Sequence, residues 1–227
     1  MSFENMVYSS LYNWLGYGQL DGRIWFVGTE EGGAEIWRNE TKSLEESLAL
    51  RSQYKLSMDF RYVWEELYDI PLESFKGSCV WRFMAAFLLA LDGKQPNKIN
   101  INNYVFERKL LGRYNSGHFM CELLPLPKKS KDSMLPYDSI WDSTSVYHEE
   151  VLSRRFEIIK NTIASKKSIE LIISYEKILT DKVLDYFKTK LIANWMYKKK
   201  KYSLYTIEIN EDRKVHFLST PFLVMAK

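Results

Sequence analysis

Carboxylates beside a glycine-rich turn are the side chains of this sequence best suited to chemistry. Residues 24–27 (IWFV) predict a short buried strand, and residues 28–33 (GTEEGG) follow it directly. Glycines there permit a tight turn and a close approach of the backbone to a ligand. Because ligands bind at the carboxyl ends of strands in open α/β sheets, Glu30 and Glu31 are candidate catalytic residues. A plain strand-to-helix loop with solvated acids accounts for the same pattern.

A further carboxylate interrupts a second apolar stretch. Residues 118–124 (HFMCELL) predict a buried strand that contains Glu122. A buried carboxylate is costly unless it is paired or used, although Glu122 also suits the solvent-exposed end of a strand. The last predicted strand ends at Ser219 and Thr220. If the three strands are neighbours, these polar groups converge on one cleft with the glycine-rich turn.

Two clusters of lysines suggest an anionic partner. Residues 198–201 are four consecutive lysines between Tyr197 and Tyr202, and Lys128 and Lys129 follow a Pro-Leu-Pro turn. Clustered lysines with aromatic neighbours suit a phosphate backbone and exposed bases. A solvated charged loop is the alternative interpretation.

Composition indicates one globular domain. The chain has 227 residues, is 46% hydrophobic and 15% aromatic, and carries a net charge of +3. No apolar run approaches the roughly 18 residues of a membrane span, and the first residues do not form a secretory signal. Cys79 and Cys121 lie in apolar surroundings, which predicts reduced, buried thiols. We therefore expect a single cytoplasmic domain over residues 1–227, monomeric and without a membrane partner.

The elements that must position these residues alternate between strands and helices. Apolar periodicity predicts helices over residues 3–15, 58–69, 79–91, 145–164 and 176–195, and residues 43–46 suit a capping box. Strands are expected at residues 24–27, 118–124 and 169–174, with a hairpin over 203–209 and 215–219. This alternation predicts a three-layer αβα fold with a mainly parallel central sheet of about four strands.

Several familiar reaction types lack their motifs in this sequence. It has no P-loop, no dinucleotide-binding G-x-G-x-x-G and no G-x-S-x-G nucleophile elbow. The three histidines are isolated, which favours structural roles for them and no histidine metal site. Acidic residues at strand ends suit either Mg²⁺-dependent phosphoryl chemistry or stabilisation of a sugar cation while a base departs.

Three segments together resemble the motifs of the uracil-DNA glycosylase superfamily. Residues 28–32 (GTEEG) after a strand resemble its first motif, a glycine and a polar residue followed by an acid or amide. Residues 121–127 (CELLPLP) resemble its middle strand, where an asparagine commonly reads the flipped base. Residues 217–222 (FLSTPF) resemble its final motif, whose loop enters the DNA groove. The segments occur in the family's order.

The resemblance implies a DNA glycosylase that flips a base out of double-stranded DNA. It implies that Glu30, with Glu31 beside it, positions the attacking water and stabilises the sugar cation, and that no cofactor or metal is needed. The base pocket would contain Gly28, Thr29, Gly32 and Glu122, with Trp81 stacking on the base unless Trp81 is a core residue. The DNA backbone would be held by a set of lysines and hydroxyls: Lys128, Lys129, Lys199, Lys200, Ser219 and Thr220.

Departures from the family pattern suggest which base is removed. Glu31 replaces the usual proline, Glu122 replaces the usual asparagine, and the last motif has no histidine. A carboxylate at position 122 would accept a hydrogen bond from an exocyclic amine such as that of cytosine. Gly32 and Gly33 leave room for a bulky base. We therefore expect removal of a modified cytosine, such as the glucosylated hydroxymethylcytosine of phage DNA, in antiviral defence.

Two alternatives remain open at this point. The first is a catalytically silent nucleic-acid-binding module on the same fold, which the departures from the motifs would explain. The second is a metal-dependent nuclease or phosphohydrolase that uses Glu30, Glu31 and Glu122 as ligands.

Overall fold

The computed structural model describes residues 1–30, 43–75, 79–128 and 132–221. The helices are α1 (Phe3–Tyr12), α3 (Leu44–Arg51), α4 (Cys79–Leu91), α5 (Lys98–Asn102), α6 (Thr144–Ser165) and α7 (Lys177–Tyr186), with shorter π or 3₁₀ turns at Tyr62–Leu67, Leu72–Phe75 and Asn103–Glu107. The strands are β1 (Gly16–Gly18), β2 (Ile24–Glu30), β3 (Ser57–Met58), β4 (His118–Leu124), β5 (Leu171–Ser174), β6 (Thr189–Tyr197), β7 (Lys200–Asn210) and β8 (Arg213–Ser219).

The described strands form one mixed sheet in the order β3-β1-β4-β2-β5-β8-β7-β6. The four strands β4, β2, β5 and β8 pair in parallel, whereas β1 joins β4, and β7 joins both β8 and β6, in antiparallel fashion. The expectation of an α/β protein is confirmed. The expected size of about four strands is wrong, because eight described strands belong to the sheet.

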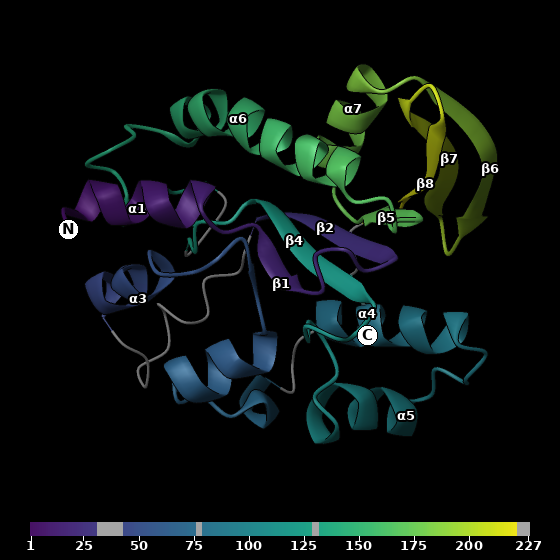
Figure 1. Ribbon diagram of the computed structural model, residues 1–227, viewed down its shortest axis with the longest axis horizontal. Helices are drawn as coiled ribbons and strands as arrows, with labels where there is room; N and C mark the ends of the chain where they lie inside the picture. The colour runs from purple at the N-terminus through teal and green to yellow at the C-terminus, as the bar shows by residue number, and fades with distance from the viewer. Residues whose placement is uncertain (31–42, 76–78, 129–131, 222–227) are drawn as a thin grey trace.

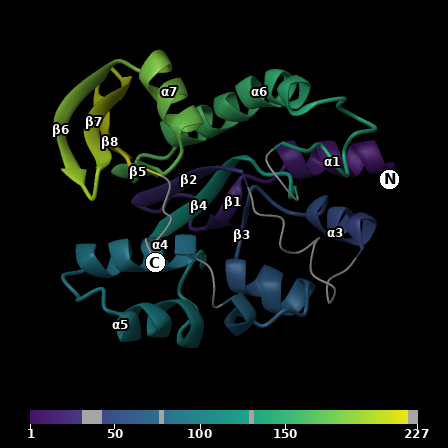
Figure 2. The same cartoon turned by 180° about the vertical axis from the view of Figure 1, so that it is seen from behind.

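Helices cover both faces of the sheet, with α6 and α7 on one side and α4 and α5 on the other (Figure 1). Side chains of a strand alternate between the two faces, so each strand supplies both cores. In β2, Trp25 and Val27 belong to the apolar cluster beneath α6 and α7, whereas Phe26 belongs to the cluster beneath α4. A third cluster joins α1, α3 and the start of α6 at the end of the molecule opposite to β6 (Figures 1 and 2).

Local sequence signals fix several of these elements. Ser43 and Glu46 form the expected capping box, because the serine hydroxyl accepts from the Glu46 backbone and the Glu46 carboxylate accepts from the Ser43 backbone. Helix α4 begins and ends where its apolar sequence predicts. Both cysteines carry free thiols, and Cys121 is buried whereas Cys79 is half-buried. No helix among the described residues is long and apolar enough to cross a membrane.

The expected helix over residues 176–195 is wrong in its second half. Helix α7 ends at Tyr186, and residues 189–197 form strand β6 instead. Residues with strong β propensity, such as Ile192, Trp195 and Tyr197, occupy this stretch, and β7 pairs with all of it except Ile192, where the register shifts. The helix expected over 58–69 is likewise shortened to a π-helical segment at 62–67 after strand β3.

Candidate functional site at the carboxyl edge of the sheet

The polar groups of the predicted cleft lie at the carboxyl ends of the parallel strands. Gly28 of β2 pairs with Glu122 of β4, and the preceding residue of β2, Val27, pairs with Ser174 at the end of β5. The chain leaving β2 continues to β3, on the β4 side of the sheet, whereas the chain leaving β5 continues to β6, on the β8 side. A crevice for a ligand is expected at such a switch point.

A carboxylate and a phenol meet above a glycine at this point. The hydroxyl of Tyr175 donates a hydrogen bond of 3.0 Å to Oε1 of Glu122. A Cβ atom on Gly28 would lie 2.2 Å from Oε2 of Glu122 and 2.5 Å from the Tyr175 hydroxyl, closer than real Cβ atoms approach. Glycine at position 28 therefore makes room for this contact. Tyr175 follows a predicted strand, but nothing in its sequence context identified it as a functional residue.

The environment of Tyr175 keeps its phenol protonated. The side chain is 3% exposed. Burial raises the pKa of Tyr175 well above its ordinary value, and the carboxylate of Glu122 raises it further. The phenol is thus a permanent hydrogen-bond donor to Glu122 over the physiological pH range.

A buried arginine fixes the backbone that carries Glu122. The guanidinium of Arg155, in α6, donates to the carbonyl oxygens of Glu122 at 2.8 Å, Leu123 at 3.2 Å and Trp14 at 2.7 Å. Arg155 is completely buried, and this burial lowers its pKa. Arg155 reaches the site from behind the sheet and is a positioning residue. The sequence showed it only as half of a basic pair on a helix.

The structure describes only part of the first motif, residues 28–32. The backbone of Glu30 pairs with Leu124, two residues beyond the pair formed by Gly28 and Glu122. Thr29 is buried, and strand alternation directs it to the face opposite to Glu122. The side chain of Glu30, and the whole of Glu31 and Gly32, lie outside the described residues.

Trp81 belongs to an aromatic cluster beneath the sheet. Its ring centroid lies 4.8 Å from that of Phe60, 5.1 Å from that of Phe75 and 6.5 Å from that of Phe106. The side chain is half-buried against the same apolar cluster that contains Tyr175. These contacts favour the interpretation of Trp81 as a core residue rather than as a stacking platform for a base.

The hydroxyls at the end of β8 join neighbouring strands and helix α7. The backbone N–H of Thr220 donates to the Ser174 carbonyl at 2.7 Å, and its hydroxyl donates to the same oxygen at 3.3 Å. The hydroxyl of Ser219 lies 3.2 Å from that of Thr180 in α7. Because Thr220 is buried and Ser219 is engaged, neither hydroxyl is directed at a phosphate group.

The two lysine clusters differ in exposure. Lys128 is 4% exposed, and its ammonium lies 5.3 Å from the ring centroid of Tyr147. This buried position does not suit a backbone contact with DNA. Lys129 lies outside the described residues.

The four-lysine run forms the tip of the β6–β7 hairpin. Tyr197 pairs with Lys200, so Lys198 and Lys199 are a two-residue turn. Their φ angles are 47° and 64°, as a type I′ turn requires. Such angles cost of the order of 1–3 kcal/mol for each residue other than glycine. Lys199 is exposed and Lys200 is half-buried.

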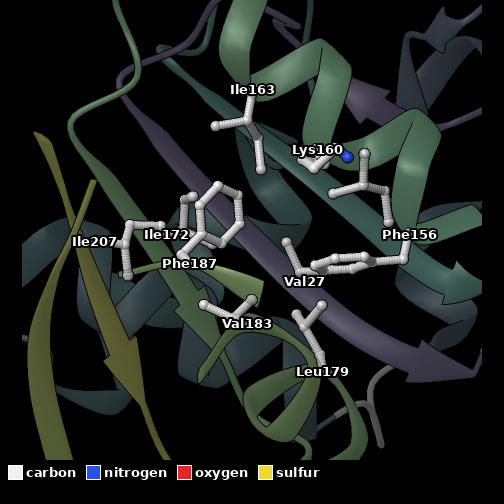
Figure 3. A pocket seen from close by; sticks show the side chains of 10 residues that line it. Val27, Phe156, Lys160, Ile163, Ile172, Leu179, Val183, Phe187 and Ile207 are labelled. Carbon is white, nitrogen blue, oxygen red and sulfur yellow. The ribbon is translucent and has the colours of Figure 1, made fainter. Parts of the chain in front are cut away.

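Two cavities elsewhere in the described structure do not suit the predicted chemistry. A void of about 10 Å³ between α6, α7 and the sheet is lined by apolar side chains and the stem of Lys160 (Figure 3). This is about the space of one water molecule in apolar surroundings, so the void is part of the core. A polar hollow of about 450 Å³ reaches from Leu89 to Ser116, at the amino end of β4 and away from Glu122.

The buried histidine has a structural role. Nε2 of His118 accepts a hydrogen bond of 2.9 Å from the backbone N–H of Gly112. Burial lowers the pKa of His118 to about 4, so the imidazole is neutral. Across the described part of the chain, no three His, Cys, Asp or Glu side chains cluster in a way that could hold a metal ion.

Together these features define a mixed α/β protein with a carboxylate–phenol site at the carboxyl edge of its parallel strands. Compared with protein-family models, curated proteins and solved structures, the chain matches none.

Proposed function

We propose that this protein is a monofunctional DNA glycosylase of the uracil-DNA glycosylase type that removes a bulky modified cytosine, such as glucosylated hydroxymethylcytosine in phage DNA. The observation that best supports the proposal is the Glu122 carboxylate, held by Tyr175 over Gly28 at the carboxyl edge of the sheet. Glu122 is half-buried, and a carboxylate held in this way by a second functional group suits a site of use better than a stabilising role in the fold.

Glu122 is the proposed reader of the base. A carboxylate offers about four acceptor positions, and Tyr175 takes one of them. A cytosine-type base presents its exocyclic amine as a donor, and a carboxylate accepts from that amine. Uracil and thymine present a carbonyl oxygen at the same position, which a carboxylate repels. This complementarity favours a cytosine derivative over uracil.

The proposed reaction hydrolyses the N-glycosidic bond of an everted nucleotide. Glu30 positions a water molecule and stabilises the positive charge that develops on the sugar as the base departs. Water adds to the sugar carbon, the base leaves with a proton, and an abasic site remains. Eversion from a duplex costs a few kcal/mol, which contacts to base and phosphate offset. In this proposal the protein acts as a cytoplasmic monomer and uses no metal or organic cofactor.

The test is release of free base from phage DNA that carries modified cytosine, measured by mass spectrometry of the small molecules. We expect base release and an alkali-labile abasic site in wild-type protein, undiminished by EDTA. Glu30→Gln abolishes release, whereas Glu211→Gln, in the exposed β7–β8 turn, leaves it intact. Direct strand breaks that disappear on chelation would identify a metal-dependent nuclease instead.

A second candidate is a nucleic-acid-binding module without catalysis. The exposed lysine turn of the β6–β7 hairpin favours binding regardless of any chemistry at Glu122. Salt-dependent DNA binding with no product from any modified DNA would establish this function in place of the first.

A further inference from the structure

The β6–β7 hairpin extends past the carboxyl edge of the parallel strands. Ser174 of β5 pairs with Ser219, the last residue of β8, and Ser219 pairs in turn with Ser203 of β7. Residues 200–202 of β7 therefore continue beyond the end of β8. Their partners in β6 are residues 195–197. The lysine turn thus stands at the same edge of the sheet as the carboxylate–phenol site.

Two aromatic rings stack on this extension. The rings of Trp195 and Tyr202 are parallel within 9°, with their centroids 5.6 Å apart. Trp195 is 43% exposed although Tyr202 covers one of its ring faces, so the remaining ring surface is accessible. An indole held flat by a stacked neighbour offers a rigid platform for another planar group.

The stacked pair stands on the same face of the sheet as Glu122. Leu204 of β7 packs against the apolar cluster beneath α4 that also contains Met120 of β4. Side chains two residues apart in a strand share a face, which places Tyr202 with Leu204 and Glu122 with Met120. The Trp195–Tyr202 pair and Glu122 are therefore on one face and at one edge.

We infer that the hairpin tip binds single-stranded DNA, with one unpaired base stacked on Trp195 and phosphates held by the exposed Lys198 and Lys199. Strand β6 is four strands away from β2, about 19 Å at the usual spacing of 4.8 Å. The path from the everted base to the stacked base therefore crosses four strand spacings of the sheet. The inference rests on the proposed function only for the role of Glu122 at the other end of this path.

The strained turn supports this assignment. Lys198 and Lys199 hold positive φ angles that Asn-Gly would adopt with less strain. The turn therefore carries two cations at a cost to the folded state. Backbone strain of this kind is maintained at sites of binding, and lysines beside an aromatic platform are the groups that bind single strands without sequence preference.

The experiment measures binding of a fluorescent 12-nucleotide strand of ordinary bases, alone and as a duplex. We expect tighter binding of the single strand by wild-type protein. Trp195→Leu should weaken it about fivefold or more. The matched control Met196→Leu, at the adjacent position facing the opposite side of the strand, should change it by less than about twofold.

Replacing both turn lysines gives an independent measurement, because stability should increase while single-strand binding decreases. Lys198→Asn combined with Lys199→Gly should raise the Tm by roughly 2–4 °C, because it removes the strain. The same variant should weaken single-strand binding and reduce the salt slope by about 1.4. Tighter duplex binding by wild-type protein, or unchanged single-strand affinity in Trp195→Leu, overturns the inference. Since these strands contain no modified base, the result is independent of whether base release occurs.

Discussion

Tyr175 and Glu122 are joined by a hydrogen bond of 3.0 Å although they come from strands that are not neighbours. Strand β2 lies between β4, which carries Glu122, and β5, which Tyr175 follows. The contact therefore passes over β2 at Gly28, where a methyl group would collide with both side chains. This crossing explains why the residue between them is glycine.

Removing the phenol hydroxyl should impair the site. In Tyr175→Phe the Glu122 carboxylate loses a buried donor, which should destabilise the fold by about 1–3 kcal/mol. Base release by the remaining folded protein should fall by about tenfold, because the carboxylate is no longer held. Denaturant unfolding and the release assay measure the two effects. The control Tyr137→Phe also removes a buried hydroxyl, which donates to the Pro127 carbonyl at 3.1 Å. Equal loss of base release in both variants would contradict a specific role for Tyr175.

Adding one methyl group at position 28 should displace the pair. Gly28→Ala should cost about 1–3 kcal/mol of stability through overpacking and abolish base release. The cost should shrink in the double variant with Glu122→Ala, since the nearest clashing atom is then absent. Urea unfolding of the single and double variants measures the coupling. Additive costs would show that Gly28 is not crowded by Glu122.

Exchanging the carboxylate for an amide should change the preferred base. In Glu122→Gln the side chain gains an N–H donor, which suits the carbonyl of uracil or thymine better than the amine of cytosine. We expect release of modified cytosine to fall by about tenfold or more, with weak release of uracil appearing. Release assays on matched oligonucleotides measure both. An unaltered preference would remove Glu122 from base recognition.

His118 should make stability depend on pH in a defined window. Its pKa in the folded protein is about 4, below the ordinary 6.5, because burial disfavours the cation. Between these values the unfolded chain binds a proton that the folded chain does not, so stability falls as the pH falls from 6.5 to 4. The slope should approach 1.4 kcal/mol per pH unit at most.

The His118→Asn variant should lose this component, since an amide side chain does not titrate. His216→Asn, at an exposed position, should retain it. Chemical denaturation at several pH values measures the slope. A wild-type slope that survives in His118→Asn would assign the titration to other groups.

Replacing Arg155 should destabilise the fold more than replacing its neighbour Arg154. Arg155→Lys keeps the charge but cannot reach all the carbonyl oxygens that the guanidinium binds, and we expect a loss of about 3 kcal/mol or more. Arg154→Lys, exposed one residue earlier in α6, alters a cation–π contact with Tyr12 at 3.8 Å and should cost about 1 kcal/mol or less. Comparable losses in the two variants would contradict the positioning role of Arg155.

The sequence predicted those parts of the fold that local patterns determine. Apolar runs identified β2, β4 and β5, and the capping residues Ser43 and Glu46 identified the start of α3. Strand β6 was missed because all but its first residue are exposed, so its apolar residues follow no one-sided alternation. Its conformation depends on pairing with β7, a contact that periodicity alone does not reveal.

The site was predictable where a residue conflicted with its surroundings. Glu122 was identified because a carboxylate in an apolar strand is unusual. Tyr175 was missed because an aromatic residue after an apolar strand looks like core, and its partner is 53 positions away in the sequence. The burial of Lys128 was missed for a related reason, since its contact with Tyr147 is long-range in the sequence.

The β6–β7 hairpin and strand β4, which carries Glu122, belong to one uninterrupted sheet. The distance between them is therefore fixed by the fold. Sliding the hairpin relative to Gly28 would require breaking backbone hydrogen bonds between β5 and β8. The separation is therefore set by the number of intervening strands rather than by a hinge. Lengthening the turn would carry the lysines further from the sheet, while Glu122 and Gly28 would keep their positions.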